Sequence, residues 1–251
     1  MSFADKVIST PVKDGTLAVF WLGQAGYIIK TPENKLIAID LYLSDYCERL
    51  VGFKRIMAKI LEPSELEFDV ILASHAHPDH FDSDSIPFMM KNKTQVYCTQ
   101  DCLAEFERLN IKNGYKVIKE GDKFDACGME ITAVPCDHGK DTPYAVGFLI
   151  RYGNKKIYFM GDTCFREDYF RDERKRNADL LLVPINGAFG NINETEAAET
   201  ALGLSAKLTV PCHFWNFAEH EGNPYKFIKS MQEIAPNNKF YLMQMGEGII
   251  I

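Results

Sequence analysis

The sequence lacks long apolar segments. No run approaches the ~18 consecutive apolar residues that a membrane-spanning helix needs. The first residues, Met1 to Pro11, mix charged and apolar side chains and do not form the apolar centre of a signal peptide. These absences predict a cytoplasmic protein without a membrane span.

The sequence also lacks cysteine pairs with metal-binding or redox spacing. The cysteines are seven in number and include no C-x-x-C pair; they stand at Cys47, Cys98, Cys102, Cys127, Cys136, Cys164 and Cys212. An odd, scattered set is typical of reduced thiols rather than of a disulfide framework, which agrees with a cytoplasmic location. Three of them, Cys136, Cys164 and Cys212, stand near candidate site residues, and their role stays open between packing and site contacts.

Positive charge is in deficit, with 28 lysines and arginines against 35 acidic residues and a net charge of -7. This balance argues against a nucleic-acid partner, because such partners bind through basic surfaces. The one basic cluster, Arg166 to Arg176, is interleaved with acids and predicts a solvated helix face. No glycine-rich phosphate-binding loop is present.

Against these absences stands one dense cluster of metal-binding residue types, the H-x-H-x-D-H motif at residues 75–80. It follows a short apolar run that predicts a buried strand. His75 and His77 are two residues apart, so in extended chain their rings lie on one side and can bind one ion. Asp79 and His80 lie beyond the turn and are available to a second ion. The motif therefore predicts a metal site at the end of a strand.

Further ionisable residues also follow predicted strands. Because open sheets bind ligands beyond the carboxyl ends of their strands, we expect these side chains to meet. They are Asp40 after 36–39, His138 after 129–134, Asp162 after 156–160 and His213 after 207–210. For Asp40 two interpretations are equally open: a turn former, or an acceptor that orients a metal-bound histidine through its other ring nitrogen.

The remaining patterns predict alternating strands and helices, with helices packed on sheet faces, which indicates an α+β fold. The expected strands are 17–22, 27–30 and 36–40 as an antiparallel meander, then 70–73, 95–98, 115–118, 129–134, a hairpin of 144–151 and 156–160, 179–183, 207–210, 239–243 and 248–251. The expected helices lie within 46–60, 82–90, 102–109, 197–204 after a capping box at 193–196, and 225–233.

The ordered set of motif residues resembles the metallo-β-lactamase superfamily along essentially the whole chain. The residues that carry the resemblance are the motif at 75–80, then His138, Gly161-Asp162 and His213. It implies a four-layer αββα sandwich forming one domain over residues 1–251. It also implies two metal sites, with His75, His77 and His138 in the first, Asp79, His80 and His213 in the second, and Asp162 bridging them.

Within the superfamily the chain is similar to the L-ascorbate-6-phosphate lactonase (UlaG-like) branch. The similar stretches are Trp21-Leu22-Gly23, Leu36 to Asp40, Val70 to Asp82, Tyr158 to Tyr169 and Pro211 to Pro224. This resemblance implies a hydrolase with two divalent ions, Zn²⁺ or Mn²⁺, and a hydroxide between them. The implied reaction opens a lactone of a small phosphorylated sugar acid, with Asp79 and Asp162 as catalytic residues and Asp79 passing a proton to the leaving alkoxide.

Other residues and functions remain alternatives. Substrate contacts are proposed for residues that surface or structural roles explain as well, namely His220, Trp215, Asn186, Tyr144 and Lys140.

A phosphodiesterase acting on a small or lipid phosphodiester is the second functional hypothesis. A diiron redox protein is the third, but such proteins resemble H-x-E-x-D-H, whereas this chain has His77 at the Glu position. We expect a small-molecule partner, and the sequence leaves open whether the chain forms a homo-oligomer.

Overall fold

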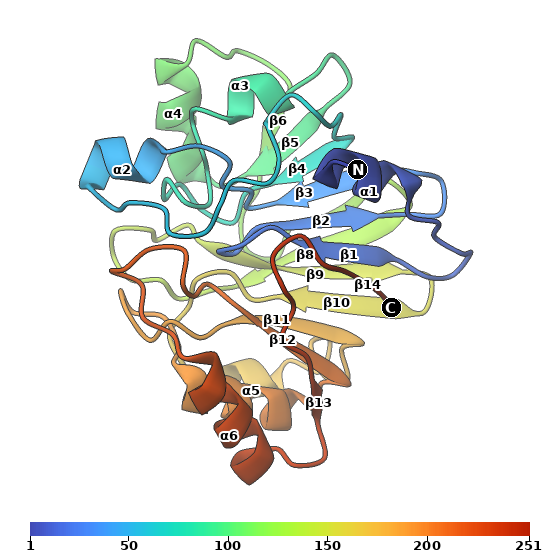
Figure 1. Ribbon diagram of the computed structural model, residues 1–251, viewed down its shortest axis with the longest axis vertical. Helices are drawn as coiled ribbons and strands as arrows, with labels where there is room; N and C mark the ends of the chain where they lie inside the picture. Colours follow the sequence, from blue (N-terminus) through green and yellow to red (C-terminus); the bar gives the residue numbers. More distant parts are fainter.

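The computed structural model describes residues 1–251 and stacks two β-sheets between layers of helices (Figure 1). The first sheet contains, in spatial order, β14 (Gly248–Ile250), β1 (Ala18–Trp21), β2 (Tyr27–Lys30), β3 (Leu36–Ile39), β4 (Val70–Leu72), β5 (Gln95–Cys98) and β6 (Tyr115–Val117). The second contains β13 (Lys239–Phe240), β12 (Leu208–Cys212), β11 (Leu180–Pro184), β10 (Lys155–Phe159), β9 (Val146–Tyr152), β8 (Met129–Pro135) and β7 (Lys123–Ala126). The predicted αββα sandwich is confirmed.

Helices cover the outer face of each sheet. The helices are α1 (Phe3–Ser9), α2 (Tyr46–Val51), α3 (Ile86–Met89), α4 (Leu103–Arg108), α5 (Glu194–Leu204) and α6 (Pro224–Ile234), with 3₁₀ turns at Gln100–Cys102 and Glu167–Arg171. In Figure 1, α3 and α4 lie above the first sheet and α5 and α6 below the second. None of these helices combines the length and the apolar character that crossing a membrane requires.

Each sheet joins an antiparallel half to a parallel half. In the first sheet β1, β2 and β3 form the predicted antiparallel meander, and β3, β4 and β5 run parallel. In the second sheet β8, β9 and β10 are antiparallel, and β10, β11 and β12 run parallel. Parallel strands end at the same edge of a sheet, so the loops that follow β4, β10 and β12 open toward one end of the sandwich.

Alternation along the strands divides the core into two parts. In β1, Val19 and Trp21 face the core between the sheets, whereas Ala18 and Phe20 face the core beneath α1, α3 and α4. Both faces of this strand are therefore buried, which is why it reads as a continuous apolar run. The sheets interlock across the middle, where the rings of Tyr27 and Phe159 meet edge to face.

Two predicted helices are shorter than their patterns indicate: the one expected within 82–90 forms only as α3, and the one expected within 46–60 ends early. The apolar spacing in 46–60 predicted a helix, but α2 ends at Val51 because Gly52 takes the left-handed conformation with φ of 82°. The segment beyond it is irregular, and Arg55 forms a β-bridge with Phe217 instead. By contrast, the capping box at 193–196 is confirmed, with the Asn193 side chain accepting the backbone N–H groups of the first turn.

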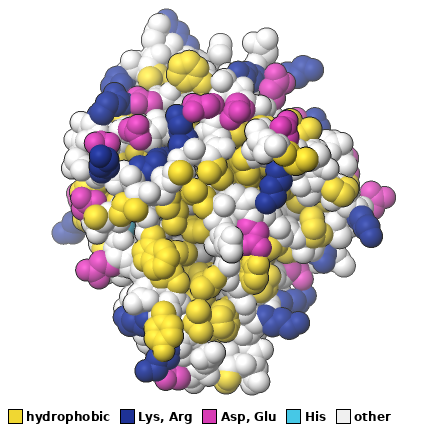
Figure 2. Space-filling view, viewed as in Figure 1, with side chains coloured by type: hydrophobic (Ala, Val, Ile, Leu, Met, Phe, Trp, Pro, Cys, Tyr) yellow, Lys and Arg dark blue, Asp and Glu magenta, His cyan; other side chains and the backbone are white.

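The basic cluster at 166–176 does not form a solvated helix face, so that prediction is wrong. Only a 3₁₀ turn forms at Glu167–Arg171. Lys175 is buried, with its ammonium 4.4 Å from the ring centre of Tyr169 and 5.3 Å from that of Tyr158. On the face shown in Figure 2, Lys and Arg side chains are interspersed with Asp and Glu around a central hydrophobic area.

Candidate metal centre

The loops beyond the strand ends bring every histidine of the chain into one place. The H-x-H-x-D-H motif follows β4, His138 follows β8, Asp162 follows β10 and His213 follows β12. All six histidines belong to groups of side chains whose nitrogen and oxygen atoms lie close enough to bind a metal ion. Segments as much as 145 residues apart in sequence, from His75 to His220, therefore meet at one end of the sandwich, as the strand-end argument predicted.

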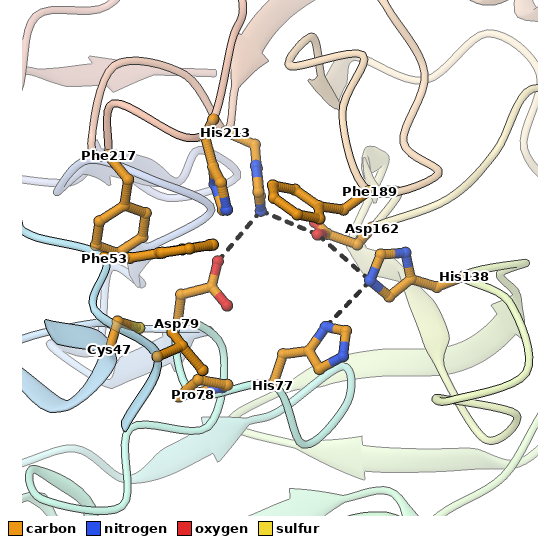
Figure 3. Close-up of a pocket in the computed structure, with 12 residues that line it drawn as sticks. Cys47, Phe53, His77, Pro78, Asp79, His138, Asp162, Phe189, His213 and Phe217 are labelled. Atoms are coloured by element: carbon orange, nitrogen blue, oxygen red, sulfur yellow. Dashed lines mark hydrogen bonds and ion pairs between the residues drawn. The ribbon is translucent and has the colours of Figure 1, made fainter. Parts of the chain in front are cut away.

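The first group is a triad of imidazoles. His75 Nε2 lies 3.0 Å from His77 Nδ1, and His138 Nε2 lies 3.1 Å from the same His77 atom. His75 is fully buried, while His77 and His138 line a cavity. Figure 3 shows His77 and His138 turned toward each other on one side of that cavity.

The second group mixes carboxylates with imidazoles. The Nε2 atoms of His80 and His213 are 3.2 Å apart, and Asp79 Oδ2 lies 3.5 Å from the first and 3.3 Å from the second. Asp162 stands between the groups: its Oδ2 is 2.9 Å from His213 Nε2 and 3.8 Å from His138 Nε2. One carboxylate thus reaches both sets of donors (Figure 3).

These spacings fit divalent cations. Four donors bound at about 2.0–2.1 Å to one tetrahedral Zn²⁺ lie about 3.3 Å apart, which matches the separations within each group. Asp162 Oδ1 is buried without a hydrogen bond of acceptable geometry, although His80 Nε2 is 3.2 Å away. A buried carboxylate oxygen without a donor is costly unless a cation compensates it. Two ions, one in each group with Asp162 between them, would satisfy these atoms.

Proton affinity differs between the two groups. Burial lowers the pKa of His75 and His77 and brings that of His138 to about 4, so the triad offers free lone pairs at neutral pH. Burial also acts on His80 and His213, but the charges of Asp162 and Asp79 outweigh it: the pKa of His80 rises well above its usual value and that of His213 rises to about 9. A cation entering the second group must displace these protons.

Asp40 lies behind the second group. Its carboxylate accepts a hydrogen bond from His80 Nδ1 at 2.7 Å and others from the backbone and side chain of Ser74. The contact leaves His80 Nε2 facing the other donors, as expected of an acceptor that orients a metal-binding imidazole. Of the two interpretations that the sequence left open for Asp40, this geometry supports the second.

Backbone strain accompanies the site. Asp40 and His213 both adopt left-handed backbone, with φ of 45° and 58°. Such conformations cost non-glycine residues about 1–3 kcal/mol each and persist only where surrounding contacts fix them. Here the amide of Asp40 donates to Leu72 O and that of His213 to Gln24 O. The strained peptides aim both side chains inward.

Gln24 is a site residue that the sequence analysis missed. Its side chain is buried, and its Nε2 donates to Asp79 Oδ2 at 2.7 Å and lies 2.8 Å from His220 Nδ1. An amide on the turn between β1 and β2 has no distinctive pattern in sequence. Only its position within Trp21 to Gly26, a stretch partly included in the lactonase resemblance, could have pointed to it.

The structure places the five residues predicted to contact substrate in different positions relative to the cavity. His220 lines the cavity and stacks on His213 with ring centres 4.8 Å apart. Asn186 is buried behind the site, where it accepts from Asn191, which in turn donates to Asp162. The other three do not line the cavity and are exposed to solvent: Lys140, Tyr144 and Trp215.

The cysteines are all free thiols, as predicted. Cys47 lines the cavity, and Cys136 donates from Sγ to the backbone oxygen of Asp162. Burial raises the pKa of Cys47, Cys136 and Cys212 above the usual thiol value, which keeps them protonated and unreactive. Their role here is packing around the site.

Comparison with known proteins agrees with this architecture. Residues 49–214 match the family described as beta-lactamase superfamily domain. A UPF0173 metal-dependent hydrolase from Polynucleobacter asymbioticus is 27% identical, with 94% of this chain and 86% of that protein covered. One from Cupriavidus necator is 30% identical, over 85% of this chain and 78% of that protein.

Solved structures show the same fold. A metallo hydrolase from the archaeon Ignicoccus hospitalis superimposes with a TM-score of 0.73 at 20% identity, covering 94% of this chain and 98% of the other. The family match spans most of the chain, including the H-x-H-x-D-H motif, His138, Asp162 and His213. The chain belongs to the beta-lactamase superfamily and is a metal-dependent hydrolase.

Proposed function

We propose that this protein hydrolyses a carboxylic ester or lactone of a small molecule, using two divalent ions held by the two groups of donors. The proposed ligands are His75, His77 and His138 for one ion and Asp79, His80 and His213 for the other, with Asp162 between them. The observation that carries the proposal is that members of both donor sets line one cavity, where a carbonyl group can approach them: His77 and His138 of the first, Asp79 and His213 of the second, and Asp162.

The bound ions would supply a water of lowered pKa and would polarise the carbonyl oxygen of the substrate. The protein's own groups keep that chemistry oriented. The neutral triad leaves its lone pairs to the cation, and Asp162 holds a negative charge between the groups. Burial opposes ionisation of Asp79, but the charges of His80 and His213 hold its pKa well below the usual range.

Asp79 is the proposed proton carrier to the leaving alkoxide. Its Oδ2 accepts the Gln24 amide hydrogen bond, which fixes the carboxylate at the edge of the cavity. A carboxylate in this position can receive the proton released as water attacks and deliver it to the departing oxygen. Gln24 is thus a positioning residue in this proposal.

The donor atoms narrow the choice of metal ion. The donors are imidazole nitrogens and carboxylate oxygens, a mixture that suits Zn²⁺, while a shared carboxylate and the lactonase resemblance favour Mn²⁺ equally. We propose that residues 1–251 act as one hydrolase domain of the lactonase-like (UlaG-like) branch. The seven free cysteines support a reducing compartment, the cytoplasm.

A phosphodiesterase is the second candidate, because paired metal ions also cleave phosphodiesters. The aromatic walls of the cavity would accommodate the apolar part of a lipid phosphodiester. The diiron redox alternative has less support. Diiron proteins of the superfamily resemble the pattern H-x-E-x-D-H, whereas this chain has His77 at the Glu position and its ring nitrogen faces His75.

The test is to load the metal-free protein with Zn²⁺ or Mn²⁺ and assay lactones alongside bis(p-nitrophenyl) phosphate. We expect lactone turnover that depends on metal, with phosphodiester turnover at background. Phosphodiester turnover without lactone turnover would overturn the proposal in favour of the second candidate.

A further inference from the structure

The cavity in front of the donors is lined by two kinds of group. Metal-facing nitrogen and oxygen atoms line part of it, and phenylalanine rings together with Val51 line much of the rest. Figure 3 shows Phe53 and Phe217 beside Asp79, with Phe189 across from them near Asp162. The cavity holds about 180 Å³. A cavity of roughly 150 Å³ with apolar walls is enough for benzene in a well-studied engineered protein.

The rings form a continuous aromatic wall. The ring centre of Phe53 lies 5.8 Å from that of Phe189 and 6.1 Å from that of Phe217. His220 meets Phe217 and Phe53 edge to face at 5.0 and 5.7 Å. These are the separations at which aromatic rings pack, and an inserted flat group would extend the same packing.

Phe189 shows that this wall is more than ordinary core packing. It is 58% exposed, yet its backbone is left-handed with φ of 53°, between Gly187 and Gly190, which are also at positive φ. For a bulky residue that conformation is unfavourable, and a ring that is 58% exposed gains only part of the packing energy that could offset it, from Phe53 and His220. The strain holds an apolar ring at the mouth of the cavity.

Lysine and arginine are absent from the cavity lining. Arg166 is engaged by Asp137 and Asp168, and Arg55 donates to the backbone oxygens of Tyr42 and Ser44. Lys140, one of the residues proposed from the sequence to contact substrate, is exposed and does not line the cavity. A phosphate group beside the phenyl rings, away from the metal-binding atoms, would therefore find no lysine or arginine to balance its charge.

We propose that the substrate carries an uncharged apolar group, an aryl ring or a short alkyl chain, next to the ester or lactone bond, and that Phe53, Phe189 and Phe217 bind this group. The inference rests on the proposed hydrolase function and narrows its substrate class. It replaces the phosphorylated sugar acid that the resemblance implied.

The test uses three γ-butyrolactones with the same reacting ring and different γ-substituents: benzyl, hydroxymethyl, and hydroxymethyl phosphate. Values of kcat/KM for the metal-loaded protein are divided by the hydroxide-catalysed rate of each lactone. We expect the benzyl compound to exceed the hydroxymethyl compound by about 10- to 100-fold, the range for burying a phenyl group, and the phosphate to be poorest.

Phe189→Ala should bring the benzyl-to-hydroxymethyl ratio down toward one. The matched control is Phe88→Ala on α3, because Phe88 is 59% exposed and does not line the cavity. Its ratio should equal that of the unaltered protein. A preference for the phosphate, or an unchanged ratio in Phe189→Ala, would overturn the inference.

A second measurement separates this inference from the proposed function. Benzyl alcohol binding to the metal-free protein is followed by saturation-transfer NMR, with the Phe189→Ala and Phe88→Ala variants alongside. If no lactone is hydrolysed but benzyl alcohol binds and Phe189→Ala abolishes the signal, the hydrolase proposal fails and the apolar pocket stands. Absence of binding in the unaltered protein, together with no lactone preference, would refute the pocket.

Discussion

The imidazole triad and the mixed group beside it lie a few ångströms apart, yet they treat protons in opposite ways. Burial is the largest influence on the pKa values of His75, His77 and His138, and it outweighs the nearby carboxylates and keeps these imidazoles neutral. In the second group the same burial is overridden by carboxylates, which keep His80 and His213 protonated without metal. The two groups should therefore differ in how many protons they release when a cation binds. The triad should release few, whereas the second group should exchange its protons for the cation.

The largest effect is expected from disrupting the imidazole triad. In His77→Ala the triad loses the imidazole nitrogen that lies 3.0–3.1 Å from both of the others. We expect loss of one bound ion and hydrolysis at the background rate, measured by metal analysis of the dialysed protein and a lactone assay. Asp137→Asn, next to His138 but paired with Arg166, is the control and should keep both. A fully active, fully loaded His77→Ala would remove that residue from the site.

Lowering the pH should separate the two groups. From pH 8 to pH 6, His213 is protonated in the metal-free protein, because its pKa of about 9 lies above that range, and the carboxylates also raise the pKa of His80 well above its usual value. Affinity for the second ion should fall about tenfold per pH unit for each proton displaced, so about 100- to 10,000-fold overall. Affinity for the first ion should stay nearly constant, since the pKa of His138 is about 4. Calorimetric titration with Zn²⁺ measures both; equal pH slopes for the two ions would contradict the comparison.

Asp40→Asn should weaken the second group selectively. The change replaces the oxygen that accepts from His80 Nδ1, and loss of such a partner costs roughly 10–100-fold in metal affinity. Asp82→Asn is the matched control, because Asp82 is equally buried but accepts hydrogen bonds from Leu43, Ser44, Asp84 and Ser85 and from no imidazole. The control should lose thermal stability while keeping its second ion. Equal loss of metal in both variants would make Asp40 a merely structural residue.

The smallest effect is expected from Gln24→Leu. It removes the N–H donor to Asp79 Oδ2, and a single hydrogen bond contributes about 0.5–1.5 kcal/mol, or roughly 2- to 10-fold. The loss should fall on kcat for the lactone, with the triad's metal affinity unchanged. An effect on the first ion as large as on kcat would show that Gln24 supports the whole end of the sandwich.

Much of the fold followed from sequence because local patterns and tertiary packing agree there. The meander at β1 to β3 and the capped helix α5 have matching apolar periodicity and turn residues. The helix predicted through residue 60 failed because Gly52 ends it and the chain then packs Arg55 against Phe217, a contact between distant segments. β7 was missed because its alternation covers only four residues, of which only Ala126 is buried.

The donors were predictable for a related reason. Histidine and aspartate directly after an apolar run are unusual, and the motif at 75–80 was specific by itself. His138 alone is a weak signal; it, Asp162 and His213 stood out because they share a position at the end of a predicted strand. Gln24 and the phenylalanine wall were not, because a glutamine in a turn and phenylalanines in loops have many ordinary explanations. Their roles depend on three loops, around Phe53, Phe189 and Phe217, closing on one cavity, which no local pattern encodes.

The most direct test of the paired-site account is anomalous diffraction from crystals of the Zn²⁺-loaded protein. The account predicts two peaks, one about 2.0–2.1 Å from His75 Nε2, His77 Nδ1 and His138 Nε2, the other at similar distances from His80 Nε2, His213 Nε2 and a carboxylate oxygen of Asp79. A single peak, or peaks away from these atoms, would contradict it.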